Sequence, residues 1–158
     1  MSAFDFTILG GGCAGLSLAY ELEVSGALQN KSLAIVEPRH RYERDKTWSF
    51  WRVSPHHFDD CVVGRWSRFS ISTADHCRTI ECPTTPYETV DSGLFYDKIL
   101  SRLALNPRVE FIADPEAADT DSGLVFNSVP PIGKSPDDTW QHFKGIEVKT
   151  AEPVFDPG

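Results

Sequence analysis

Near the N-terminus, three glycines recur at a spacing that suits phosphate binding. Gly10, Gly12 and Gly15 form a G-x-G-x-x-G loop that follows the apolar run 4–9 and opens a helical stretch. In such a loop the first glycine permits a tight turn, the second lets the backbone approach a pyrophosphate, and the third allows close packing of helix and sheet. The amides and positive dipole end of the following helix also attract anions. We therefore expect a dinucleotide to contact the six residues of this loop, Gly10, Gly11, Gly12, Cys13, Ala14 and Gly15.

An acidic residue follows at the distance expected for a partner of the adenosine ribose. Glu37 stands 22 positions after Gly15 (37 − 15), at the end of a second apolar run. A carboxylate in this place hydrogen-bonds the ribose hydroxyls of a bound dinucleotide. The order of strand, loop, helix, strand and acid predicts a βαβ dinucleotide-binding unit over residues 1–37. The other interpretation is a glycine-rich turn of an unrelated α/β protein, which this order of elements disfavours.

The elements that must position these groups follow from the hydrophobic pattern. Residues 6–9 are extended-favouring and mostly apolar, as in a central parallel strand buried on both faces, and 32–37 are similar. Between them, 14–23 are predicted to form a helix that ends near Gly26, a candidate C-cap. The helical spacing predicts one buried face, made of Ala14, Leu18, Ala19 and Leu22.

A long insertion interrupts the sheet pattern after the second strand. A charged run at 38–46 is followed directly by an apolar, aromatic cluster at 47–51. Residues 66–72 alternate as a half-buried strand does, and 77–82 are expected to return as its hairpin partner. We therefore predict an inserted β segment at 61–82, which we assign to a substrate region.

The sheet pattern resumes in the second half of the chain. Ser92 is a suitable N-cap for a helix at 93–105, and strands are expected at 109–112 and 123–127. A further β segment of the substrate region is expected at 139–158. The fold class is therefore α/β, a Rossmann-like dinucleotide-binding domain with an inserted β segment.

Length and charge restrict the class of protein. A chain of 158 residues holds one core, whereas flavin and nicotinamide enzymes commonly exceed about 250 residues. We therefore expect residues 1–158 to be the N-terminal part of a longer protein, truncated at its C-terminal side. The formal charge of −8, from 15 basic and 23 acidic residues, argues against a nucleic-acid partner.

Other residue types give few further leads. No stretch resembles a transmembrane helix or a signal peptide, so we predict a cytoplasmic protein and leave peripheral contact with the inner face of a membrane open. The four cysteines contain no C-x-x-C pair, which argues against a zinc site or a redox dithiol. The histidines are scattered, apart from the adjacent His56 and His57, and we predict no metal site.

Three segments together carry a family resemblance. The first is the glycine loop, which many flavoproteins share. The second is Glu37-Pro38, followed by Asp-Lys-Thr-Trp-Ser-Phe-Trp at 45–51. The third, at 140–148, is similar to a Trp-Gln-x-Phe-x-Gly-x-x-Val strand. In this order, the segments resemble the FAD-dependent lycopene cyclases, which form the β-rings of carotenoids.

The resemblance implies a flavoprotein that closes β-ionone rings at the linear ends of lycopene or a related carotenoid. It implies FAD in reduced form, NAD(P)H as reductant, and acid-base chemistry without net redox change. Trp48, Phe50 and Trp51 are the substrate candidates, although aromatic clusters are more often part of a core. The family's catalytic carboxylates lie beyond Gly158, so we assign no catalytic residue.

The chain departs from the family pattern at one place, and two other interpretations of its function are considered. Many members have Asp-x-Arg-Gly or Asp-Ser-Arg-Pro after a later strand of the sheet, where this chain has Asn-Ser-Val-Pro-Pro at 127–131, so we assign no ligand contact there. Another FAD-dependent oxidoreductase, of the monooxygenase, halogenase or geranylgeranyl reductase type, would share the loop and Glu37 but not the aromatic segments. The other alternative is a non-catalytic, truncated nucleotide-binding fragment.

Overall fold

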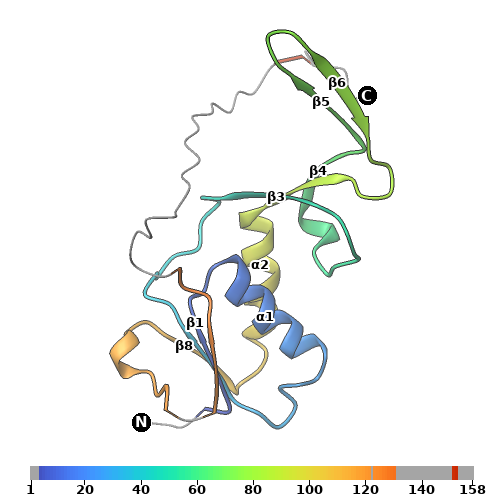
Figure 1. Ribbon diagram of the computed structural model, residues 1–158. Helices are drawn as coiled ribbons and strands as arrows, with labels where there is room; N and C mark the ends of the chain where they lie inside the picture. Colours follow the sequence, from blue (N-terminus) through green and yellow to red (C-terminus); the bar gives the residue numbers. More distant parts are fainter. Residues whose placement is uncertain (1–3, 122, 131–150, 153–158) are drawn as a thin grey trace.

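A computed structural model describes residues 4–121, 123–130 and 151–152 of the chain. It contains a parallel sheet with strand order β8-β2-β1-β9, and α1 joins β1 to β2 (Figure 1). The elements are β1 (Phe6–Leu9), α1 (Cys13–Val24), β2 (Leu33–Val36), β8 (Val109–Ile112) and β9 (Leu124–Asn127). Numbered along the chain, these parallel strands have the order 3-2-1-4 of a Rossmann-like half. The mixed α/β prediction is confirmed, and the topology is consistent with a Rossmann-like domain.

The registers of the parallel strands bring their carboxyl ends to one edge of the sheet. Leu9 pairs with Val36 on one side and Asn127 on the other, and Val36 pairs with Ile112. All four residues of β2 are buried, since β1 and β8 flank the strand and α1 packs against it. The loops that follow β1, β2, β8 and β9 therefore meet at the same edge.

The insertion between β2 and β8 forms a separate antiparallel sheet and a hairpin. Strand β7 lies between β3 and β4, and β5 pairs with β6 in the hairpin that projects at the top of Figure 1. The bounds are β3 (Thr47–Trp51), β4 (Val62–Trp66), β5 (Arg68–Ser72), β6 (Cys77–Glu81) and β7 (Tyr87–Asp91). The predicted hairpin is confirmed, but its first strand is divided at Ser67. Strands β3 and β7 were not predicted, because their pairing joins segments about 40 residues apart.

Helix α2 (Ser92–Leu103) links this sheet to β8 and packs against α1. Its N-cap is Asp91, whose carboxylate accepts a hydrogen bond of 3.0 Å from the Leu94 N–H, so the predicted cap at Ser92 is wrong. The Ser92 hydroxyl instead accepts a hydrogen bond of 3.0 Å from the Lys46 N–H. It thereby ties the start of α2 to the segment before β3.

The buried face of α1 also differs from the prediction. Gly15, Leu16 and Ala19 are buried, whereas Ala14 is exposed and Leu18 and Leu22 are only partly buried. The close contact of Gly15 with the preceding loop fixes the rotation of the helix, which hydrophobic spacing alone does not determine. The helix ends at Val24, and Gly26 follows the Ser25 cap with a left-handed φ of +79°.

Two short 3₁₀ helices, η1 (Asp59–Cys61) and η2 (Pro115–Ala117), complete the described elements. Of the loop between β8 and β9, the structure describes all residues but 122, and η2 is the one helical element among them, in agreement with the prediction that no longer helix fits there. In the part of the chain that the structure describes, no helix has the length and apolar character needed to cross a bilayer. The β segment predicted at 139–158 lies outside the described residues, apart from 151–152.

Candidate functional site

The glycine loop follows β1 and crosses the carboxyl edge of the parallel sheet. Gly10 has a φ of +96°, which favours glycine, and its N–H donates to the Val36 carbonyl at 2.9 Å. A Cβ on Gly15 would collide with the Gly10 carbonyl oxygen and lie 2.9 Å from the Ser128 hydroxyl. Only glycine at position 15 therefore lets α1 begin this close to the loop.

Gly12 borders open space at the start of α1. Its backbone is extended, and an added Cβ would meet no described atom within 4 Å. Gly12 is the N-cap of α1, no side chain among the described residues caps this end, and the first turn has no acidic residue. The first amides of α1 are thus available to an anion, as a dinucleotide site requires. Burial raises the pKa of the Cys13 thiol, so this group adds no negative charge at neutral pH.

Glu37 reaches back from the end of β2 to the glycine loop. Its Oε2 accepts a hydrogen bond of 2.8 Å from the Gly11 N–H, and its Oε1 accepts one of 3.0 Å from the Arg39 N–H. A carboxylate has about four acceptor positions, so about two remain for further donors. The side chain is 16% exposed and borders a cavity.

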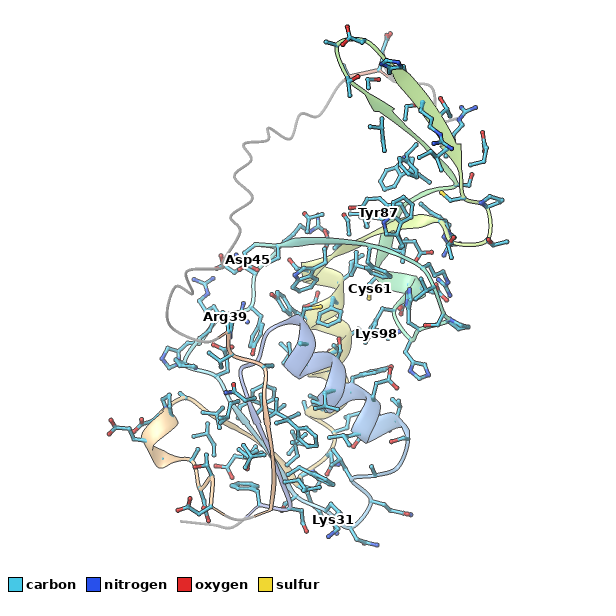
Figure 2. The ribbon with its side chains drawn as sticks, in the orientation of Figure 1. Lys31, Arg39, Asp45, Cys61, Tyr87 and Lys98 are labelled. Atoms are coloured by element: carbon cyan, nitrogen blue, oxygen red, sulfur yellow. The ribbon has the colours of Figure 1, made fainter. Side chains whose placement is uncertain are left out.

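Arg39 completes the attachment of Gly11, and sequence reasoning missed it. Its Nη2 donates to the Gly11 carbonyl at 2.9 Å, and its Nη1 donates to the Tyr96 hydroxyl at 3.3 Å. Glu37 and Arg39 therefore hold both backbone polar groups of Gly11. Figure 2 labels Arg39 and Asp45 along the segment that joins β2 to β3. The available signal was position, since residues two apart in an extended segment share a side.

A cavity of about 290 Å³ adjoins this arrangement at the carboxyl ends of β2 and β8. Arg39 stacks on the Tyr42 ring, with its guanidinium carbon 4.4 Å from the ring centroid. The lining combines charged, aromatic and apolar side chains: Glu37, Arg39, His40, Tyr42, Leu100, Phe111 and Ala113. The space beside Glu37 is therefore concave, with one carboxylate and one guanidinium.

The model of the family described as lycopene cyclase protein matches residues 5–158. The chain belongs to the lycopene cyclase family. Among curated proteins, none matches the chain. Membership of the lycopene cyclase family indicates a carotenoid cyclase that acts on a carotenoid substrate.

The three aromatic substrate candidates of this lycopene cyclase family member do not share one face of β3. Trp48 packs edge-on against Phe95, with ring centroids 5.1 Å apart, and Phe50 also packs against the core. Trp51 lies on the opposite face and is 40% exposed. Its ring contacts Tyr87 with a centroid distance of 4.8 Å. A substrate role for all three residues stays a prediction, and the geometry separates Trp51 from the other two.

Around Trp51, the open face of the antiparallel sheet forms an aromatic groove of about 590 Å³. The groove has few polar groups, and it is lined by Trp51, Trp66, Arg68, Phe69, Tyr87 and Thr89. Tyr87 is labelled in Figure 2 near the base of the projecting hairpin. The third family motif, at 140–148, lies outside the described residues.

A cluster of charged side chains around the buried Glu88 lies on the other face of the sheet. Glu88 is fully buried on β7, and it accepts hydrogen bonds from Arg65 at 2.6 Å and from Arg52 at 3.2 Å. Its other oxygen lies 3.1 Å from His56 Nε2. Although burial opposes ionisation, these partners lower the pKa of Glu88 below its ordinary value. Ligand atoms of His56, Asp59 and Glu88 also lie within 4.8 Å of one another, but both carboxylates already bind guanidinium groups.

Proposed function

We propose that this chain supplies the adenosine diphosphate half of an FAD site in a lycopene β-cyclase. The observation that carries the proposal is the uncapped start of α1, where Gly12 borders open space and Glu37 holds the neighbouring Gly11. A Rossmann-like site binds a pyrophosphate at such a helix end and a ribose at such a carboxylate. Family membership makes a carotenoid the expected substrate.

In this proposal the residues of the chain bind and orient the cofactor. The free amides at the start of α1 would hold the pyrophosphate, and the remaining acceptor positions of Glu37 would hold the ribose hydroxyls. Bound reduced flavin, with NAD(P)H as reductant, would supply an electron-rich surface beside the cationic centre of ring closure. The net chemistry is isomerisation, because one proton is added to the terminal alkene and one is removed.

The proposal includes a cytoplasmic protein in peripheral contact with a membrane. A linear carotenoid hydrocarbon partitions into lipid, so the enzyme must reach its substrate at a bilayer surface. The acidic composition of the chain, with a formal charge of −8, favours contact through apolar groups rather than attraction to anionic lipids.

Expression of the full-length protein in cells that accumulate lycopene tests this proposal. We expect β-ring carotenoids to form and the purified protein to retain FAD. Because Gly12→Ala places a methyl group where the phosphate must approach, this variant should lose both. Unchanged lycopene in the presence of bound flavin would exclude the cyclase assignment, and a purified protein that cannot bind FAD would exclude the cofactor assignment.

A further inference from the structure

Two buried polar atoms beside the glycine loop have no hydrogen-bond partner among the described residues. They are the hydroxyl oxygen of Tyr42 and the Nε of Arg39. A third such atom, Oγ1 of Thr7, lies within the parallel sheet on β1. Buried polar groups are nearly always paired in folded proteins, and an unpaired one lowers stability. Two unpaired groups next to a candidate ligand site therefore need an explanation.

Both atoms belong to side chains that surround the loop and Glu37. A Cβ on Gly11 would collide with the Tyr42 hydroxyl and lie 2.9 Å from the Cβ and Cγ of Glu37. The Arg39 guanidinium, labelled in Figure 2, stacks on the Tyr42 ring and donates to the Gly11 carbonyl. The same two side chains line the cavity of about 290 Å³ beside Glu37.

The Tyr42 hydroxyl is a proton donor at neutral pH. Burial, followed by the negative charge of Glu37, raises the pKa of Tyr42 to about 12. The Arg39 guanidinium opposes this shift in the pKa of Tyr42. Its N–H groups are nevertheless not placed to make a hydrogen bond to the Tyr42 hydroxyl. Even a rotation that paired Arg39 Nε with the Tyr42 oxygen would leave the hydroxyl hydrogen without an acceptor.

We infer that Tyr42 and Arg39 donate hydrogen bonds to acceptor oxygens on the ribose-phosphate of a bound adenine dinucleotide. The inference rests on the proposed FAD site and adds two ligands to it. Ribose hydroxyls both donate and accept, so Glu37 takes their protons while Tyr42 and Arg39 donate to the oxygen lone pairs. Phosphate oxygens are acceptors only and suit the same two donors.

This role predicts effects of opposite sign on folding and on binding. A hydroxyl without a partner contributes nothing favourable to the ligand-free protein, so Tyr42→Phe should not destabilise it. The same substitution removes a donor to the ligand, which should weaken binding about tenfold. A hydroxyl with a purely structural role would instead lower the unfolding temperature and leave the affinity unchanged.

The experiment compares wild type, Tyr42→Phe and Thr7→Val in the full-length protein. FAD, ADP and adenosine are titrated by calorimetry, and thermal unfolding is measured without ligand. Thr7→Val is the matched control, because it also removes an unpaired buried hydroxyl but lies within the sheet. The unfolding temperature of this variant should not fall, and its affinities for the three ligands should equal those of wild type.

For Tyr42→Phe, we expect FAD and ADP to bind about tenfold more weakly than to wild type, and the unfolding temperature to equal or exceed that of wild type. Equal weakening of adenosine binding would identify the ribose as the acceptor, and unchanged adenosine binding would identify the phosphate. Wild-type affinity for all three ligands, or a lowered unfolding temperature, would overturn the inference. If wild type itself binds neither FAD nor ADP, the proposed function fails first, which is a distinct result.

Discussion

Replacing Gly12 with alanine should separate dinucleotide binding from folding. Gly12 has φ −83° and ψ −165°, a conformation that alanine adopts without strain, and an added Cβ meets no described atom within 4 Å. The loss of glycine entropy in the unfolded state favours alanine by about 0.4–1 kcal/mol. The poorer N-cap propensity of alanine opposes this by a similar amount. We therefore expect the free energy of unfolding to change by less than about 1 kcal/mol.

The effect on binding should be much larger. The new methyl group occupies the place where the backbone must approach the pyrophosphate, and it keeps the first amides of α1 away from the phosphate oxygens. A hydrogen bond to a charged group contributes about 1.5–3 kcal/mol, so the loss of two costs about 3–6 kcal/mol. Because each 1.4 kcal/mol corresponds to about a factor of ten, the Kd for FAD should rise at least about 100-fold.

Gly15→Ala provides the matched control for this experiment. Its Cβ would collide with the Gly10 carbonyl oxygen, so the start of α1 must shift, at a cost of about 1–3 kcal/mol in stability. The assay is an FAD titration by flavin fluorescence, together with urea unfolding of each ligand-free variant. The reasoning is refuted if Gly12→Ala binds FAD like wild type, or if it loses as much stability as Gly15→Ala.

Two further predictions concern the stability of the fold. Glu88→Gln removes the buried charge that pairs with Arg52, Arg65 and His56. We therefore expect a loss of about 1–3 kcal/mol in the free energy of unfolding, measured with urea. An unchanged urea midpoint would contradict this. Hydrogen bonds from Lys31 and Ser32 lower the pKa of Asp5 from 3.8 to about 2. Because the folded-state pKa is lowered, the stabilisation is complete above about pH 4 and disappears as the pH falls toward 2. Asp5→Asn should remove this part of the acid dependence of the unfolding temperature, and identical pH profiles for the two proteins would exclude it.

The glycine loop and the parallel sheet were predictable because their signals are local. The turn at Gly10 requires a left-handed φ, and the apolar strands on either side of α1 are buried on both faces. Each requirement acts within about ten residues, so the sequence records it directly. The position of Glu37 was predictable for a related reason, since the length of a βαβ unit is nearly constant.

The supporting residues were not predictable because they act across long separations. Arg39 contacts Tyr96 from 57 positions away, and Glu88 joins His56 from 32 positions away. The position of Arg39 two residues after Glu37 indicates a shared side, but a charged run does not show whether an arginine on that side folds back onto a loop or points into water. The two faces of β3 were missed for a similar reason, because Trp51 could be separated from Trp48 only once the strand pairing was known.

Ser128, which follows β9, has a structural role in the glycine loop. Asn127 and Val129 replace the acidic residue and the arginine of the Asp-Ser-Arg-Pro pattern, whereas Ser128 matches its serine. The Ser128 hydroxyl is directed toward the carbonyls of Leu9 at 2.8 Å and Gly10 at 3.0 Å. The same hydroxyl lies 2.9 Å from the place that a Cβ on Gly15 would occupy, so a bulkier side chain here would displace α1. The glycine loop is therefore held by Glu37 and Arg39 on the β2 side and by Ser128 on the β9 side. Since β9 lies more than 100 residues after the loop in sequence, Ser128 reaches the loop only when β9 has paired with β1.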